Sequence, residues 1–91
     1  MSLKLTIPTA LRKITGNADV VEVQSGTVQE IIEQLDRSYS GFLSRVCEDD
    51  GKLRRFINIY VNGEDIRFLE NLSTRVPEGS ELSIILAIAG G

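Results

Sequence analysis

Apolar and polar residues alternate at the start of the chain, through residues 3–7. This period of two is typical of a strand with one buried face. Pro8 ends regular pairing, because proline has no amide proton to donate. A second run rich in β-branched residues, residues 19–24, indicates another strand, which Ser25-Gly26 closes. We expect the two strands to form a hairpin with a long connection.

The pattern then changes to a helical period. Thr27 followed three residues later by Glu30 is a capping box, in which the hydroxyl and the carboxylate accept hydrogen bonds from amides that the first helical turn leaves free. The apolar positions that follow are spaced i, i+3, i+4 and i+7. They are Val28, Ile31, Ile32 and Leu35. The sequence therefore predicts a helix that packs through one face and exposes the other.

A connector follows this helix. Residues 39–41 interrupt the helical pattern, and Phe42, Leu43 and Val46 indicate a short second helical turn before a polar loop, residues 48–52. We expect the connector to end where the next apolar run begins.

The second half of the chain predicts three strands. They are residues 56–61, 65–68 and 81–88. The first two are joined by Asn62-Gly63, a pair favoured in two-residue hairpin turns. A looser stretch, residues 69–76, leads to a turn at residues 77–80, where proline presets one dihedral angle and glycine is free to take positive φ.

This order of elements predicts an α+β fold, in which a mixed sheet of four to five strands packs on one main helix. That arrangement looks like the ubiquitin-like β-grasp. With 91 residues, of which 42% are apolar and 25% charged, the chain is sufficient for one small domain. We assign residues 1–87 to a β-grasp domain and residues 88–91 to a flexible C-terminal diglycine tail.

Composition excludes several classes of protein. No apolar run approaches the roughly 20 residues that a bilayer span needs, and the N-terminus lacks the segments of a signal peptide. We therefore expect no membrane partner and a cytoplasmic location. A net charge of -3 without a long basic stretch argues against nucleic acid as a partner.

Candidate chemistry is sparse in the body of the chain. Histidine is absent, which removes the most frequent general base and metal ligand, so we expect no catalytic residue and no bound cofactor. The trio Glu48, Asp49 and Asp50 lacks the alternating ligands of a calcium loop and predicts an exposed turn, not a metal site. Cys47, the only cysteine, cannot form an internal disulfide. We expect it to fill a small half-buried site rather than to accept sulfur as a persulfide.

Three motifs carry a family resemblance that spans nearly the whole chain. They are Leu11-Arg12 with Thr15-Gly16 after the first strand, residues 77–82 before the last strand, and Ala89-Gly90-Gly91 at the end. With this pattern the chain resembles the MoaD/ThiS sulfur carriers, which share the β-grasp fold with ubiquitin.

A second set of motifs narrows the resemblance. Residues 7–9, 39–41 and above all 51–62 are similar to the carrier that feeds a cysteine synthase. The connector at residues 40–55 makes the chain longer than the thiamine carriers, which favours the cysteine or the molybdopterin branch. The molybdopterin branch stays open as an alternative, with this chain as the small subunit of molybdopterin synthase beside a large subunit.

The resemblance implies a task for the C-terminus. An E1-like adenylyltransferase/sulfurtransferase would use ATP to adenylate Gly91, and a sulfur donor would displace AMP to leave a thiocarboxylate. Ala89 and Gly90 would lie in the narrow channel of the partner, where a bulky side chain would obstruct passage. In the cysteine branch, a PLP-dependent cysteine synthase would receive the sulfur and a zinc metallopeptidase would release cysteine from the tail.

Two other interpretations of the diglycine end remain. It could be a frayed terminus without a task, since termini are often disordered. It could also belong to a ubiquitin-like modifier joined through Gly91 to lysines of other proteins.

Strand alternation also predicts a docking surface. If Ile57, Ile59 and Val61 face the helix, their neighbours Phe56, Asn58 and Tyr60 face the opposite side of the sheet. We expect a partner-binding surface formed by Phe56, Tyr60, Ile85 and Ala87. The alternative is that residues 40–52 of the connector cover it.

Overall fold

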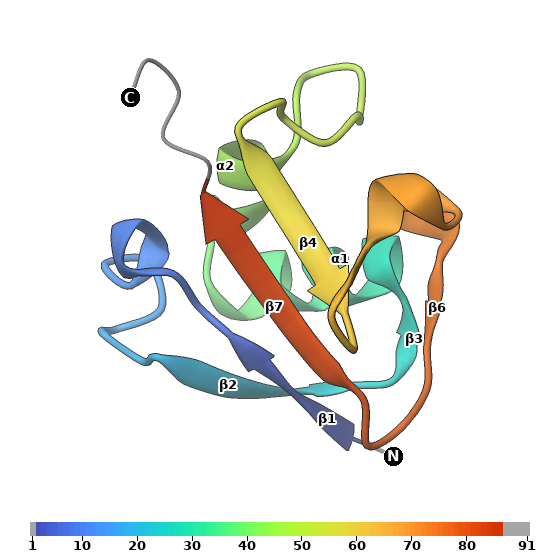
Figure 1. Ribbon diagram of the computed structural model, residues 1–91. Coiled ribbons are helices and arrows are strands. Elements are labelled where there is room, and N and C mark those ends of the chain that lie inside the picture. The colour runs from blue at the N-terminus through green and yellow to red at the C-terminus, as the bar shows by residue number, and fades with distance from the viewer. Residues whose placement is uncertain (1, 87–91) are drawn as a thin grey trace.

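A computed structural model describes residues 2–86 of the chain (Figure 1). Its β-strands are β1 (Ser2–Thr6), β2 (Val20–Gln24), β3 (Gly26–Thr27), β4 (Ile57–Val61), β5 (Glu64–Asp65), β6 (Arg75–Val76) and β7 (Glu81–Leu86). Its helices are α1 (Val28–Ser38), α2 (Phe42–Val46) and the short 3-10 turns η1 (Thr9–Leu11), η2 (Ile66–Phe68) and η3 (Asn71–Ser73).

The main sheet has five strands in the order β2-β1-β7-β4-β5. β1 pairs antiparallel with β2, as the predicted hairpin requires, and parallel with β7. β7 also pairs antiparallel with β4, so the strand that leads to the C-terminus lies at the centre of the sheet. Figure 1 shows α1 and α2 on the same side of this sheet. The predicted mixed sheet on one main helix is confirmed.

The inward-facing side chains of the strands and the apolar face of α1 pack together in one hydrophobic core. Ile57, Ile59 and Val61 are buried, as predicted, and so are Leu82 and Ile84. Leu86, which the alternation also places inward, is only half-buried at the end of β7. The four apolar positions of α1 are buried as well. Each large aliphatic side chain removed from water in this way contributes about 1.5–3 kcal/mol.

The start of α1 is set by the predicted capping box, which is confirmed. The amide of Glu30 donates to Thr27 Oγ1 over 3.1 Å, and the amide of Thr27 donates to Glu30 Oε1 over 2.8 Å. The predicted turn at Asn62-Gly63 is also confirmed, with φ of 51° and 86°. Both values lie in the left-handed region that a type I′ hairpin turn requires.

The predicted strand at residues 65–68 is wrong beyond its first residue. β5 ends at Asp65, and Ile66–Phe68 forms η2 instead. The Asp65 carboxylate accepts a hydrogen bond from the amide of Arg67 over 2.9 Å, which offers the backbone an alternative to the strand ladder. The turn also places Ile66 in the core, where it is fully buried.

A small second sheet was not predicted. β3 and β6 pair antiparallel, with Gly26 opposite Val76 and Thr27 opposite Arg75. The amide of Val28 extends this contact by donating to the Thr74 carbonyl over 2.9 Å. The stretch at residues 69–76, for which the sequence predicts no regular structure, therefore contains η3 and β6.

Candidate functional site

The strand that leads to the C-terminus positions the candidate site. The described part of β7 ends at Leu86, which pairs with Ile57 of β4. Four residues of the predicted site, Ala87, Ala89, Gly90 and Gly91, lie outside the described residues. The surface around Leu86, where the C-terminal segment begins, is therefore the part of the site that the structure places.

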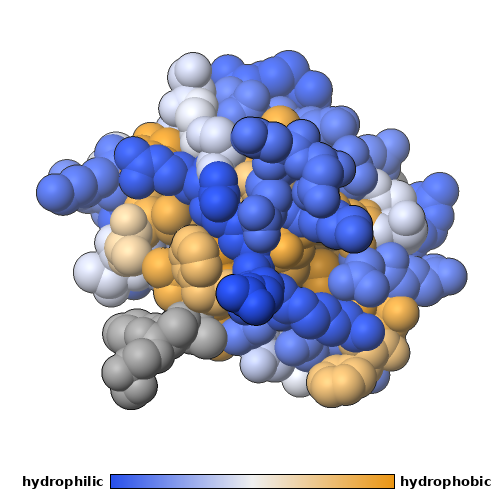
Figure 2. Space-filling view, turned by 90° about the horizontal axis from the view of Figure 1, so that it is seen from above, coloured by the Kyte–Doolittle hydropathy of each residue, from blue (hydrophilic) through white to orange (hydrophobic). Residues whose placement is uncertain are grey.

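Of the described members of the predicted docking surface, Tyr60 and Ile85 lie on the sheet face opposite the helices, and Phe56 lies in the turn just before β4. Ile85 is 49% exposed and Phe56 42% exposed. Ile85 lies directly opposite Asn58 of β4, two residues from Phe56 on one side and from Tyr60 on the other. Neighbours on a diagonal of one face are roughly 7–8 Å apart, within reach of aromatic side chains. Figure 2 views the molecule from above, onto the end from which the C-terminal segment leaves, and shows apolar surface bordered by strongly hydrophilic side chains.

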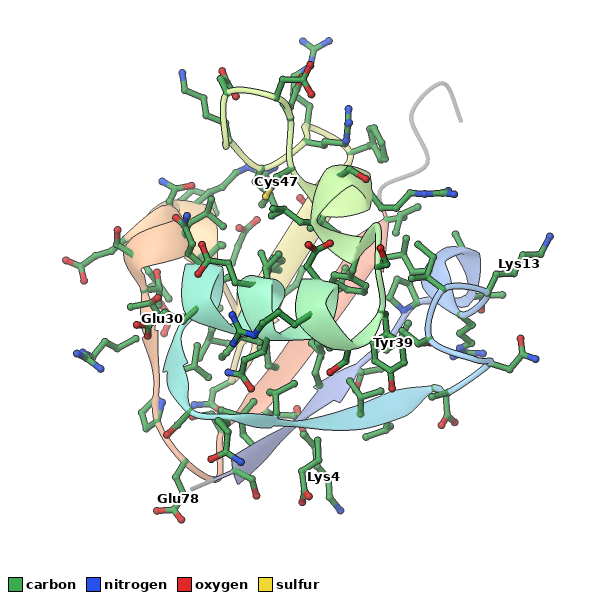
Figure 3. The ribbon with its side chains drawn as sticks, turned by 180° about the vertical axis from the view of Figure 1, so that it is seen from behind. Lys4, Lys13, Glu30, Tyr39, Cys47 and Glu78 are labelled. Carbon is green, nitrogen blue, oxygen red and sulfur yellow. The ribbon has the colours of Figure 1, made fainter. Side chains whose placement is uncertain are left out.

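The connector does not cover this face. Phe42 and Val46 of α2 are both fully buried in the core that α1 also enters. Seen from behind, α2 lies on the same side of the sheet as α1 (Figure 3). Ser44 and Arg45 of α2 border Phe56 at one cleft, but Phe56 and Ile85 stay 42% and 49% exposed, so residues 40–52 do not cover them.

An arginine that sequence reasoning missed fixes the start of β4. Arg67 of η2 donates through Nη1 to Asn58 Oδ1 over 2.6 Å. Its Nη2 donates to two backbone carbonyls, those of Arg54 over 3.0 Å and Ile57 over 2.8 Å. These bonds hold both ends of the segment that presents Phe56. Periodicity could not have found these bonds, because the sequence predicts a strand at Arg67, and it is the turn of η2 that directs this side chain to Arg54, Ile57 and Asn58.

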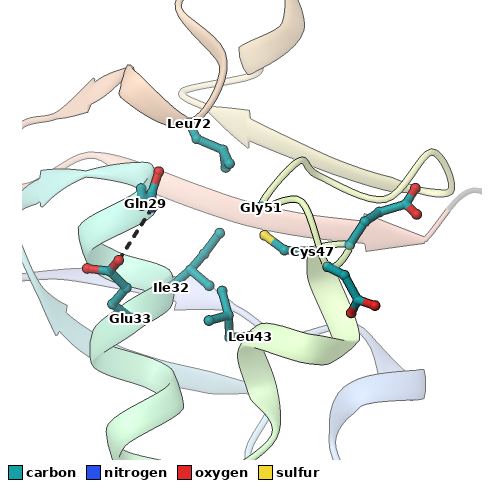
Figure 4. Close-up of a pocket in the computed structure, with 9 residues that line it drawn as sticks. Gln29, Ile32, Glu33, Leu43, Cys47, Gly51 and Leu72 are labelled. Atoms are coloured by element: carbon teal, nitrogen blue, oxygen red, sulfur yellow. Dashed lines mark hydrogen bonds between the residues drawn. The ribbon is translucent and has the colours of Figure 1, made fainter.

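Cys47 lies away from the end of β7, between the helices. Its side chain is 5% exposed and lines a cavity of about 150 Å³ between α1, α2 and η3, together with Ile32, Leu43 and Leu72 (Figure 4). No residue of β7 lines this cavity. Burial raises the pKa of the Cys47 thiol, and the positive charge of Arg54 opposes the shift only in part. The thiol is thus held in its less nucleophilic, protonated form.

The acidic turn after Cys47 is exposed, as predicted. The amide of Lys52 donates to Asp50 Oδ1 over 3.0 Å, and the amide of Glu48 donates to the Lys52 carbonyl over 2.7 Å. Across residues 2–86, no three side chains of the metal-binding types gather into a cation site. Over the same residues, no helix has the length and apolar character needed to cross a bilayer.

Comparison with known proteins gives consistent likenesses over the whole chain. A model of the ThiS family matches residues 5–91. The chain is 41% identical over 93 aligned positions to the sulfur carrier protein CysO of Mycobacterium tuberculosis (strain ATCC 25618 / H37Rv), with 100% of both chains covered. It is 26% identical over 93 positions to small archaeal modifier protein 3 of Haloferax volcanii, again with 100% of both covered.

A solved structure extends the likeness to three dimensions. The crystal structure of the Amycolatopsis orientalis BexX/CysO complex contains a chain that matches with a TM-score of 0.90 and 43% sequence identity. The match covers 98% of this chain and 99% of that chain. The predicted β-grasp fold is confirmed.

Proposed function

The chain belongs to the ThiS family, and from this premise we propose that it carries sulfur as a thiocarboxylate on its C-terminal residue, Gly91. The observation that carries the proposal is a family match that runs to the last residue, where the sequence ends in two glycines. The full-length similarity to a sulfur carrier protein supports the same function.

The chemistry requires activation, because a free carboxylate is a poor electrophile. A carboxylate oxygen of Gly91 attacks the α-phosphorus of ATP in an E1-like partner, and pyrophosphate leaves. Hydrosulfide, or its equivalent from a sulfur donor, then attacks the carbonyl carbon, and AMP leaves with the bridging oxygen. The new C–S bond makes the product a thiocarboxylate, whose sulfur is a soft nucleophile for the next enzyme.

The tail and the body have separate tasks in this proposal. Residues 1–87 form the domain that partners recognise, and residues 88–91 form the tail that enters the partner's active site. Glycine at 90 and 91 leaves the path to the carbonyl carbon free of side chains. The five residues after Leu86 can span at most about 18 Å, so a partner must hold the domain within that distance of its ATP site.

The surface around Phe56, Tyr60, Ile85 and Ala87 is the docking surface that we propose for such partners. The exposure of Phe56 and Ile85 beside the end of β7 supports this assignment. The complex of CysO with BexX supports the expectation that a carrier of this kind assembles with other proteins. We assign the sulfur to cysteine biosynthesis, with a PLP-dependent cysteine synthase and a zinc peptidase as downstream partners.

Intact-mass measurement tests the carrier function. The chain is incubated with ATP, sulfide and an E1-like adenylyltransferase, and the expected product has one oxygen replaced by sulfur. Deletion of Gly91 should abolish the change and leave the thermal midpoint of unfolding unaltered, because the core is built from residues before the tail. Glu78→Gln, an exposed change in the turn before β7, is the matched control and should load normally.

Two results would refute this mechanism: a Gly91-deleted chain that still gains sulfur, or a wild-type chain that is adenylated but never gains sulfur from any donor. A second candidate function, protein modification, is favoured by the full-length likeness to small archaeal modifier protein 3. It predicts a different product in the same measurement, namely adducts of higher mass in which Gly91 is joined to a lysine of another protein.

A further inference from the structure

A cleft lies where the C-terminal segment begins, and four segments from across the sequence form it. It has a volume of about 320 Å³. We call it the tail-root cleft. Its lining residues are Ala10 and Leu11 of η1, Ser44 and Arg45 of α2, Arg54 and Phe56 just before β4, Ile57 of β4, and Leu86 of β7.

The floor and one wall of the tail-root cleft are apolar. Leu11 and Ile57 are buried, and the ring of Phe56, at 42% exposure, forms part of the open side. Leu86, the last described residue of β7, is half-buried in the same cleft. An apolar side chain that entered here would exchange water for contacts with already ordered residues, which is the usual character of an anchor pocket in an interface.

Among the described residues, the charged side chains that line the cleft are both positive. Arg45 and Arg54 line the cleft, and no Asp or Glu does, although the whole chain has a net charge of -3. Arg45 is exposed, and its side chain makes no hydrogen bond or ion pair within residues 2–86. Arg54 is held in place, because its Nε and Nη2 both donate to the Ser44 carbonyl, over 3.2 and 2.9 Å.

We propose that the tail-root cleft receives a segment of the adenylating partner in which an apolar side chain lies beside a carboxylate. The apolar side chain occupies the floor, and the carboxylate pairs with Arg45 at the rim. Charge complementarity selects this occupant, because two arginines with no Asp or Glu among the described lining residues attract an anionic group and disfavour a basic one. The inference rests on the proposed sulfur-carrier function and adds a recognition element to it.

The tail-root cleft lies at the point from which the C-terminal segment leaves the domain. Leu86 both lines the cleft and begins the path to Gly91. A partner that grips the cleft therefore fixes the origin of the tail, and the five residues beyond cannot place the carboxylate farther than about 18 Å away. Such a grip reduces the volume that the carboxylate must search, which raises the frequency of productive encounters with ATP.

The charge half of the proposal is tested by reversing Arg45. The variants Arg45→Glu and Arg75→Glu make the same charge change at exposed positions, but Arg75 lies on β6, away from the cleft. Loading is measured with an adenylyltransferase that loads the wild-type chain. We expect Arg45→Glu to raise KM roughly tenfold at unchanged kcat, and Arg75→Glu to leave both within about twofold.

Salt provides a readout that a merely structural effect would not move. Added salt should raise the KM of the wild-type chain and of Arg75→Glu, because it screens the pairing of Arg45 with the partner's carboxylate. Added salt should raise the KM of Arg45→Glu less than that of the wild-type chain, or should lower it. Equal KM values and equal salt responses for the two variants would overturn the charge half of the proposal.

The apolar half is tested by filling the cleft. Ala10→Trp places a large ring at its edge, whereas Ala10→Ser changes the same exposed position without filling space. We expect the first to raise KM roughly tenfold or more and the second to load normally, with thermal midpoints confirming that both fold. Normal loading by Ala10→Trp would overturn the assignment of the cleft.

The outcomes separate this inference from the function on which it rests. If the wild-type chain gains sulfur and all four variants load alike, the carrier function stands and the cleft assignment fails. If no adenylyltransferase acts on Gly91 of the wild-type chain, both fail. Concentration-dependent dimerisation of the wild-type chain that Ala10→Trp abolishes would instead identify a second copy as the occupant and would overturn the proposal.

Discussion

Cys47 shows how the surroundings of a single residue decide its chemistry. In sequence it is an isolated thiol in a protein of the sulfur-carrier family, which invites a role in sulfur transfer. In the structure it is buried against α1 and η3, and burial raises the pKa of the thiol. Because the thiolate is the reactive form, this environment lowers reactivity at neutral pH. Packing accounts for the residue without any transfer step.

We predict that Cys47→Ser retains loading of Gly91 and changes the pH dependence of stability. The folded state holds the Cys47 proton at a pH where the unfolded chain has lost it. The contribution of the thiol to the free energy of unfolding should therefore be fully present below the usual thiol pKa of about 8.5. It should be lost as pH rises through the raised pKa of the folded state. Urea unfolding of both proteins from neutral to alkaline pH measures the difference.

The difference between wild type and Cys47→Ser isolates the thiol from the lysines and tyrosines that titrate in both proteins. A difference that stays constant with pH would contradict the assigned burial effect. Loss of thiocarboxylate formation in the variant would show that the thiol takes part in transfer, against our interpretation.

At the scale of elements, η2 and β4 depend on one another. The turn of η2 exists because Asp65 caps it, and its middle residue, Arg67, reaches back to Asn58 and to two carbonyls at the start of β4. Phe56, a member of the proposed docking surface, lies in sequence between those carbonyls, which belong to Arg54 and Ile57. A short irregular segment thus holds the turn before β4, whose first residue, Ile57, pairs with Leu86 at the end of β7.

We predict that Arg67→Met lowers the free energy of unfolding by about 1.5–3 kcal/mol, because it removes charge-assisted hydrogen bonds and leaves carbonyls without their partner. Arg75→Met, at an exposed position, should change it by less than about 0.5 kcal/mol. Urea titration at neutral pH gives both values. Equal stability of the two variants would mean that the Arg67 bonds contribute nothing measurable.

At the scale of the whole molecule, the connector belongs to the core and is not an appendage. Phe42 is fully buried, whereas its neighbour Leu43 in the same helix is 37% exposed. The ring of Phe42 joins the cluster formed by the sheet and α1. The connector therefore adds core volume on the helical side, and Ile85 on the opposite sheet face stays 49% exposed.

We predict that Phe42→Ala destabilises the protein by about 3–5 kcal/mol, through lost burial and the cavity left behind. Leu43→Ala should cost about 1 kcal/mol or less, since much of that side chain is already in water. Thermal and urea unfolding compare the two. A small effect of Phe42→Ala would indicate that the connector folds back without supporting the core.

The sequence alone was sufficient to predict the features that depend on residues close together in the chain. The capping box at Thr27 and Glu30, the Asn62-Gly63 turn and the alternation in β1, β4 and β7 all follow from residues within a few positions of each other, where periodicity and backbone preference act directly. The diglycine end and its preceding motifs were also sufficient to identify the family. The assignment of Gly91 as the sulfur-carrying residue stays a proposal.

Only the tertiary structure decided the features that join distant parts of the chain. The pairing of Gly26 with Val76, the reach of Arg67 to β4, and the tail-root cleft formed by η1, α2, β4 and β7 have no local signature. The same holds for the side of the sheet that the connector covers. Each is set by how the elements pack to bury their apolar faces, and that packing depends on residues that are far apart in sequence.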